Sequence, residues 1–243
     1  MTFATATIGA MSTSPHSILF LNGAGLPPWI WDEVRHRLDD SYETQVASRP
    51  HGDATRLRDY VEAAIDSVAA DRVTIVAHSA GGVVGAEVAR VVAERVTGFL
   101  AVTAVVPQPG GSFVSAMPVP NRWILGAAMR VAGTRPPDSA IRKTLAHGID
   151  DQTTDQLIAD FTPEPQSYYR DRTDKQTWDG RKGYVITTND REIPSALQRR
   201  FSMNLGAKWQ RELATGHLAM VENPEALGET ITQFLEWHPD SSD

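Results

Sequence analysis

A serine lies at the junction between an expected strand and an expected helix, in the stretch RVTIVAHSAGGVVGAEVAR over residues 72–90. The residues from Val73 to Ala77 are typical of a buried strand, and a helical pattern begins directly after Ser79. Alanine and glycine stand two residues before and after the serine, so the chain can turn tightly there. Such a turn holds a serine above the carboxyl edge of a sheet, where a nucleophile is presented. The alternative is a strand–helix turn that merely contains a serine.

The order of the segments predicts an α/β fold with a mainly parallel sheet of about six strands and helices on both faces. Strand-like and helix-like segments alternate along both ends of the chain. The expected strands are 17–22, 43–47, 73–77, 98–106, 183–188 and 207–213, and the expected helices are 31–38, 57–68, 80–95, 195–203 and 224–237.

The alternation breaks over residues 108–178, which hold three proline-bounded helical pieces and no strand pattern. We therefore expect residues 17–107 and 179–243 to form the core, and residues 108–178 to form a helical cap inserted into it. A plain helical layer is the alternative. Residues 1–16 are expected to be a flexible leader.

The composition excludes several functional classes. The chain has 243 residues, a formal net charge of -7 and no basic stripe, which argues against a nucleic-acid partner. It has no cysteine, so a thiol nucleophile, a disulfide framework and a cysteine-based metal site are excluded. No apolar run approaches the roughly 20 residues needed to cross a bilayer, and no secretory signal pattern is found. We expect a cytoplasmic protein that acts on a small molecule without a membrane partner; its oligomeric state stays open.

A nucleophilic serine needs a general base, and His217 is the best placed of the seven histidines. It lies in the stretch LATGHLAMVENPE, on a loop between an expected strand and the last helix, at the same sheet edge as Ser79. His78 adjoins the serine, but the neighbouring side chain on such a turn points away from the nucleophile. We expect His78 to be a structural, hydrogen-bonded residue.

The base needs a carboxylate that orients it, and Asp190 follows a strand directly in the stretch YVITTNDREIP. The preceding strand, AVTAVVPQ, ends without a carboxylate, and Glu192 is the fallback. The chain order Ser79, Asp190, His217 is that expected of α/β-hydrolases.

Two backbone N–H groups should stabilise the oxyanion that forms when the serine attacks. One is that of Ala80, which follows the nucleophile. The other is that of Ala24, in the loop GAGLPPWIW after the first strand, where Gly23 permits a close backbone approach.

The segments FLNGAGLPPWIW, AHSAGG, TTNDREIP and TGHLAMVENPEAL together resemble the α/β-hydrolase superfamily. They are most similar to the small capped esterases of the plant methylesterase and hydroxynitrile lyase group. Members commonly have His-Gly where this chain has Asn22-Gly23, and Leu218 stands where the lyases carry a lysine. The resemblance implies ester hydrolysis through an acyl-enzyme, with no metal or organic cofactor.

The substrate pocket is predicted from nearness to these motifs and from position in the cap, and core packing is the open alternative for each residue. The set is largely apolar, which favours a small, mostly neutral ester or lactone; Arg170 or Arg172 would serve a charged substrate. A lyase, a cofactor-free oxygenase and a ligand-binding receptor with a vestigial triad remain alternatives. The pocket candidates are Leu26, Trp29, Met117, Trp123, Phe161, Tyr168 and Met220.

Overall fold

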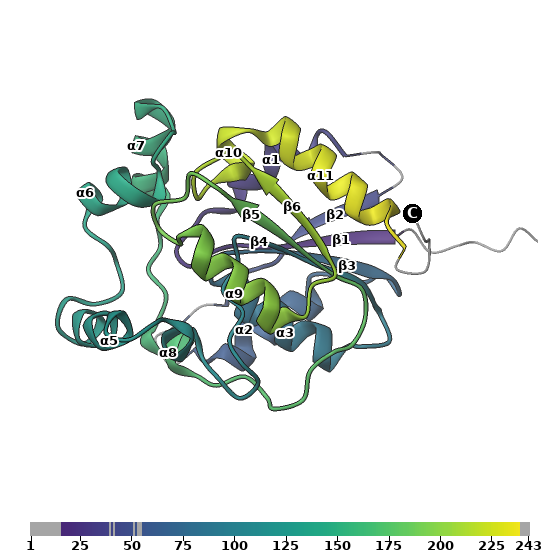
Figure 1. The fold of residues 1–243 in the computed structure, drawn as a ribbon, viewed down its shortest axis with the longest axis horizontal. Helices are drawn as coiled ribbons and strands as arrows, with labels where there is room; N and C mark the ends of the chain where they lie inside the picture. The colour runs from purple at the N-terminus through teal and green to yellow at the C-terminus, as the bar shows by residue number, and fades with distance from the viewer. Residues whose placement is uncertain (1–15, 39, 41, 51, 53–54, 239–243) are drawn as a thin grey trace, which may run out of the picture.

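Six strands form one parallel sheet in the computed structural model, which describes residues 16–38, 40, 42–50, 52 and 55–238. Their spatial order is β2-β1-β3-β4-β5-β6, and Figure 1 labels each strand. The expected α/β class and strand number are confirmed. The strands are β1 (His16–Leu21), β2 (Tyr42–Val46), β3 (Val73–His78), β4 (Val96–Val102), β5 (Lys182–Thr187) and β6 (Trp209–Leu213).

The order in which the chain adds strands changes side at β1: β2 is added on one side of it, and β3 and the later strands on the other. β2 pairs on one side of β1 and β3 pairs on the other, with Leu21 opposite Ala77 at the carboxyl ends. The loops that follow β1 and β3 therefore leave the sheet side by side and diverge. In open α/β sheets, ligands bind in the crevice at such a switch point.

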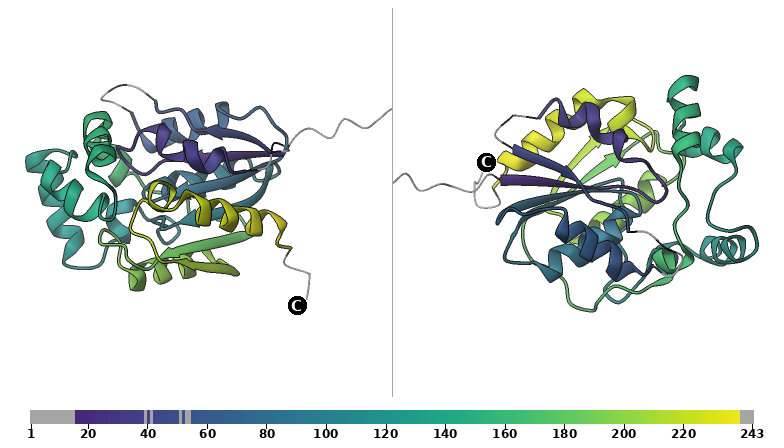
Figure 2. Two further views of the ribbon diagram at one scale, coloured as in Figure 1. Left: turned by 90° about the horizontal axis from the view of Figure 1, so that it is seen from above. Right: turned by 180° about the vertical axis from the view of Figure 1, so that it is seen from behind.

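Helices cover both faces of the sheet (Figures 1 and 2). One layer contains α2 (Leu57–Asp66), α3 (Gly81–Val91) and α9 (Ser195–Leu205), and the other contains α1 (Asp32–Arg35), α10 (Ala219–Glu222) and α11 (Pro224–Glu236). Successive strand side chains point to opposite faces, so two hydrophobic cores form. Leu19 and Ile75 pack in the first core, and Phe20 and Val76 in the second.

The segment between β4 and β5 holds five α-helices, which lie beyond the carboxyl edge of the sheet or beside it (Figures 1 and 2). We call residues 108–178 the cap segment. Prolines precede several of its helices, including α5 and α8, and the expectation of only three helical pieces was wrong. The helices are α4 (Phe113–Ala116), α5 (Asn121–Ala132), α6 (Asp138–Ala140), α7 (Asp151–Asp160) and α8 (Gln166–Arg170), with a π-helical turn over Ile141–Leu145.

Several expected boundaries differ from the structure. The strand expected over 98–106 ends at Val102, because Thr103 has a φ of 40°, which extended backbone does not adopt. The helix expected over 31–38 is a 3-10 turn, Pro28–Trp31, followed by the short α1. The leader expected over 1–16 lies outside the described residues, except that His16 begins β1.

We predict that Ile75→Ala lowers the free energy of unfolding by about 2–5 kcal/mol, because it leaves a cavity in a core strand. Ile75 is fully buried, whereas Ile124 is 64% exposed. The matched variant Ile124→Ala should change that free energy by no more than about 0.5 kcal/mol. Urea unfolding of both variants checks the prediction, and equal losses would contradict this description of the core.

Candidate active site

Ser79 occupies a strained turn between β3 and α3. Its φ is 50°, in the left-handed region that residues other than glycine rarely adopt. A β-carbon on Gly81 would lie 2.6 Å from the carbonyl oxygen of Asn22, so a larger residue at that position would clash with the first loop. The Ser79 carbonyl accepts from the Val105 N–H at 2.8 Å. The turn is thus hydrogen-bonded to the loop after β4 and lies close against the loop after β1.

The structure brings together the three residues that the sequence predicts as a triad. The Nε2 of His217 lies 3.1 Å from the Oγ of Ser79, and its Nδ1 lies 2.8 Å from the Oδ2 of Asp190. The side chains of His217 and Asp190 are completely buried. His217 follows β6 and Asp190 follows β5, so the parallel sheet delivers both to the edge where Ser79 stands.

Asp190 accepts hydrogen bonds at both carboxylate oxygens. Its Oδ1 accepts from the N–H groups of Glu192 and Ile193, at 2.7 and 2.9 Å. Burial acts to raise the pKa of Asp190, but the adjacent His217 and these hydrogen bonds outweigh it and hold the pKa below its ordinary value. The group is therefore an anion at neutral pH. The fallback acid, Glu192, instead contacts Thr144 of the cap segment through its carboxylate.

Two polar residues around Asp190 were missed by the sequence analysis. Thr103 donates its hydroxyl to Oδ2 at 2.7 Å, and the amide of Gln198 lies 3.4 Å from the same oxygen. Both residues are completely buried. Thr103 directly follows β4, the strand whose end carries no carboxylate. The partner of its hydroxyl, Asp190, follows the neighbouring strand β5 and lies 87 residues further along the chain.

His78 is fully buried behind the serine, in the role expected of it. Its Nε2 donates to the backbone carbonyl of His217 at 3.0 Å, and the two imidazole rings lie 4.7 Å apart. Burial, and then the proximity of His217, hold the pKa of His78 well below its ordinary value. A neutral His78 thus supports the backbone of the residue that is predicted as the base.

Residues 22–26 run beside the serine turn, and we call them the oxyanion loop because they contain Ala24, one of the two predicted N–H donors. Asn22, which stands in place of the common histidine, accepts from the indole N–H of Trp31 at 2.7 Å and donates to the Leu26 carbonyl at 3.0 Å. The asparagine therefore closes the loop on itself. Ala24 and Ala80, the predicted N–H donors, line one cavity with Ser79 and His217.

This cavity has a volume of about 200 Å³ and lies between the sheet edge and the cap segment. Its polar lining groups include Thr134, Thr144 and Glu192 beside the triad. Of the predicted pocket residues, Leu26 and Phe161 line it. The other apolar and aromatic lining residues are Ala24, Ala80, Phe113, Leu125, Met129, Pro136, Ala140, Ile141, Leu145 and Tyr169.

The other five predicted pocket residues do not line this cavity. Met220 is buried in the core beneath α11, and Met117 packs against the opposite core. Tyr168 packs edge-on against Tyr60 at 4.5 Å. Trp29 donates its indole N–H to Asp160, and Trp123 is 68% exposed. Nearness in sequence to the motifs did not separate the residues that line the cavity from those that pack.

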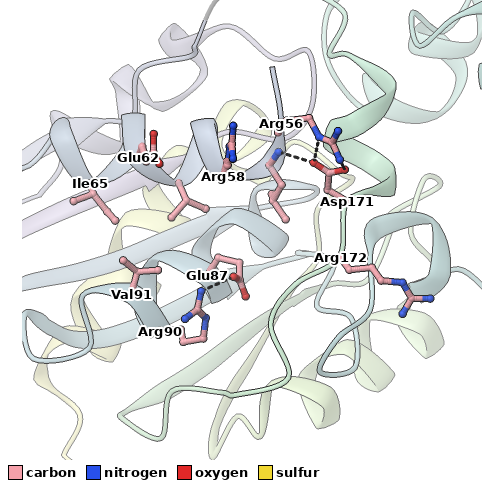
Figure 3. Close-up of a pocket in the computed structure, with 11 residues that line it drawn as sticks. Arg56, Arg58, Glu62, Ile65, Glu87, Arg90, Val91, Asp171 and Arg172 are labelled. Atoms are coloured by element: carbon pink, nitrogen blue, oxygen red, sulfur yellow. Dashed lines mark hydrogen bonds and ion pairs between the residues drawn. The ribbon is translucent and has the colours of Figure 1, made fainter. Parts of the chain in front are cut away.

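A larger surface hollow of about 590 Å³ lies between α2 and α3, away from the triad (Figure 3). Four of its seven charged side chains pair among themselves. Arg56 contacts Asp171 at 2.7 Å, and Arg90 contacts Glu87 at 3.0 Å. Arg172 donates to the Gly110 carbonyl at 2.7 Å. The hollow shares no lining residue with the cavity at Ser79, and we assign no site to it.

Within the described residues, no group of three or more histidine or acidic side chains is arranged to hold a metal ion. In the same part of the chain, no helix combines the length and apolar character needed to cross a membrane.

Residues 18–230 match the model of the alpha/beta hydrolase family. An extracellular α/β-hydrolase from a Paenibacillus species superposes on this chain with a TM-score of 0.81 at 18% identity, over 90% of this chain and 98% of that one. That protein is described as sharing structural and functional homology with tobacco salicylic acid binding protein 2. The methylesterase MES16 from Arabidopsis gives 0.72 at 16% identity, over 90% and 98%. Polyneuridine aldehyde esterase gives 0.72 at 15% identity, over 91% and 99%. No curated protein sequence gives a significant match.

We predict that the free energy of unfolding falls as the pH drops below about 6.5, by up to about 1.4 kcal/mol per pH unit from His78 alone. Its pKa is lowered in the folded protein. The unfolded chain therefore binds a proton there that the folded chain does not, and the contribution is lost as the pH falls.

His78→Gln, which keeps an N–H donor, should flatten this slope in urea unfolding at pH 7, 6 and 5. His36 is exposed, so His36→Gln should retain the slope of the wild type. Equal slopes in all three proteins would show that His78 is not held neutral.

Proposed function

The chain belongs to the alpha/beta hydrolase family, and we propose that it is a serine hydrolase that cleaves a small, largely apolar carboxylic ester or lactone through an acyl-enzyme. The observation that carries this proposal is the continuous contact from Ser79 through His217 to Asp190, at 3.1 and 2.8 Å, at the wall of an apolar cavity. The similar structures include proteins named as esterases, which supports ester chemistry.

In the first step, Oγ of Ser79 attacks the carbonyl carbon of the ester, and the Nε2 of His217 takes the hydroxyl proton. His217 then gives that proton to the departing alkoxide. Asp190 fixes the imidazole tautomer with the proton on Nδ1, which leaves Nε2 free to accept. The anionic carboxylate also stabilises the imidazolium that forms between these transfers.

The tetrahedral intermediate places a negative charge on the former carbonyl oxygen. Backbone N–H groups of Ala24 and Ala80 would donate to it from two sides, since both residues line the cavity with Ser79. Ala80 lies at the amino end of α3, where the helix dipole also favours a negative charge. In the second half of the reaction, water attacks the acyl-serine with His217 again as the base.

The cavity limits the substrate by size and polarity. A volume of about 200 Å³ fits a short acyl or alcohol group beside the serine. Phe113, Leu125, Met129 and Phe161 supply an apolar lining, and Glu192 is the carboxylate that reaches it beside the triad. This lining disfavours an anionic substrate and favours a neutral ester.

We predict that Ser79→Ala and His217→Ala each lower kcat for a short-chain ester by a factor on the order of 10⁴ to 10⁶, because the two residues act as one unit. Initial rates on a panel of p-nitrophenyl esters check this, with circular dichroism to verify folding. A fluorophosphonate should label Ser79 in the wild type, and labelling should be abolished in His217→Ala. Turnover close to wild type in either folded variant would overturn the proposed function.

We predict that Ala140→Phe lowers kcat/KM for a butyrate ester about tenfold more than for the matching acetate, because the new ring fills space that the longer acyl chain needs. Ala140 lines the cavity, whereas Ala127 lies on the exposed side of α5. Ala127→Phe is therefore the control, and its butyrate-to-acetate ratio should match the wild type. An unchanged ratio in Ala140→Phe would show that the acyl chain lies elsewhere.

A further inference from the structure

A buried carboxylate connects the cap segment to the oxyanion loop. Glu164 lies between α7 and α8 and is only 4% exposed. Its Oε1 accepts from the Gly25 N–H at 3.2 Å and lies 3.0 Å from the Nε of Arg49, while Oε2 accepts from the hydroxyl of Tyr60. A buried charge requires such partners. None of these residues belongs to the predicted triad.

The cap segment holds the peptide groups on both sides of Gly25. Glu164 accepts from the Gly25 N–H, and the Thr162 N–H donates to the Gly25 carbonyl at 3.0 Å. Arg49, paired with Glu164, also donates to the Leu26 carbonyl at 3.1 Å. Gly25 has a φ of 77°, and a β-carbon there would lie 2.1 Å from the ring of Phe161. The loop and the cap segment therefore fit together closely at this glycine.

This arrangement constrains the N–H of Ala24, the proposed oxyanion donor. That N–H belongs to the peptide group immediately before those held by Glu164 and Thr162. Rotation about the backbone bonds of Ala24 would break the contact between Gly25 and Glu164 at 3.2 Å. Donors must point at the developing oxyanion before the reaction, since reorientation during the reaction costs rate.

We propose that Glu164 is a positioning residue that aligns the Ala24 N–H, so that the oxyanion site is complete only while the cap segment is docked on the loop. This inference rests on the proposed hydrolase function. Glu164 touches neither the substrate cavity nor the triad in the structure. It acts through the backbone of the loop.

Asp171 provides a matched control, because it is also a cap-segment carboxylate that holds the core. It pairs with Arg56 and accepts from the Leu57 N–H at 3.1 Å, at the start of α2 (Figure 3). α2 carries Tyr60, but Asp171 itself makes no contact with the oxyanion loop in the described structure. Loss of Asp171 should remove the contact of the cap segment with α2 while its contact with the oxyanion loop, through Glu164 and Gly25, stays in place.

The test compares Glu164→Leu with Asp171→Leu in the full chain. For Glu164→Leu we expect kcat on a short-chain ester to fall about 10- to 100-fold with KM changed by less than about threefold, because the lost alignment acts on the transition state. The affinity for a trifluoromethyl ketone, which forms a tetrahedral adduct on the serine, should fall by a similar factor. Asp171→Leu should lower Tm but leave both quantities within about twofold of the wild type.

Glu164→Asp is the second variant, in case Glu164→Leu does not fold. It keeps the charge but withdraws the oxygen from Gly25, and it should lower kcat and adduct affinity together by about tenfold. This inference alone would be overturned if the wild type is active and the folded Glu164 variants have the same rates and adduct affinities as Asp171→Leu. A wild type that neither turns over esters nor forms the adduct would overturn the proposed function, and this inference with it.

Discussion

The parallel pairing of β1 with β3 is the constraint on which the site depends. With Leu21 opposite Ala77, the oxyanion loop and the serine turn leave adjacent strands at the same height. The pairing of β5 with β6 likewise brings the loops of Asp190 and His217 together. Thr187 lies opposite Leu213, and each of the two loops begins just after these residues. Hydrogen bonds of the sheet thus place four loops, distant in sequence, around one point.

The buried polar groups then make this placement specific. Asp190 joins the loop after β5 to Thr103 after β4 and to His217 after β6, and His78 joins β3 to the carbonyl of His217. Each of these buried groups would be costly without its partner. Ser79 and Thr103 both have positive φ values, and each contacts a neighbour in this network. In the described part of the chain, the two residues other than glycine with a positive φ therefore both belong to this hydrogen-bonded network.

The sequence allowed the fold class, the strand number and the grouping of Ser79, Asp190 and His217 to be predicted, because each of these residues follows a strand with a clear local pattern. In a parallel sheet, that position alone brings them to one edge. Thr103, Gln198 and Glu164 could not be found in this way. Their importance comes from partners in other elements, such as the contact of Glu164 with Gly25, 139 residues away.

The residues that line the cavity were predicted less well, for a related physical reason. Apolar residues near a motif face the cavity or the core according to their direction on a helix or loop, and the sequence of the cap segment gives only weak periodicity. Leu26 and Phe161 line the cavity, whereas Met220 and Tyr168 are packed elsewhere. The boundary at Val102 was also missed, because a positive φ at threonine has no sequence signal.

The cap segment itself has two parts with different contacts. Residues 121–145 contribute Leu125, Met129 and Ile141 to the cavity wall. Residues 161–171 also reach that wall, through Phe161 and Tyr169, but in addition they hold the oxyanion loop and α2 through Glu164 and Asp171. For the proposed hydrolase, natural drift or laboratory evolution could therefore replace the first part and alter which esters fit, while Glu164 and Asp171 in the second part keep their contacts with the core.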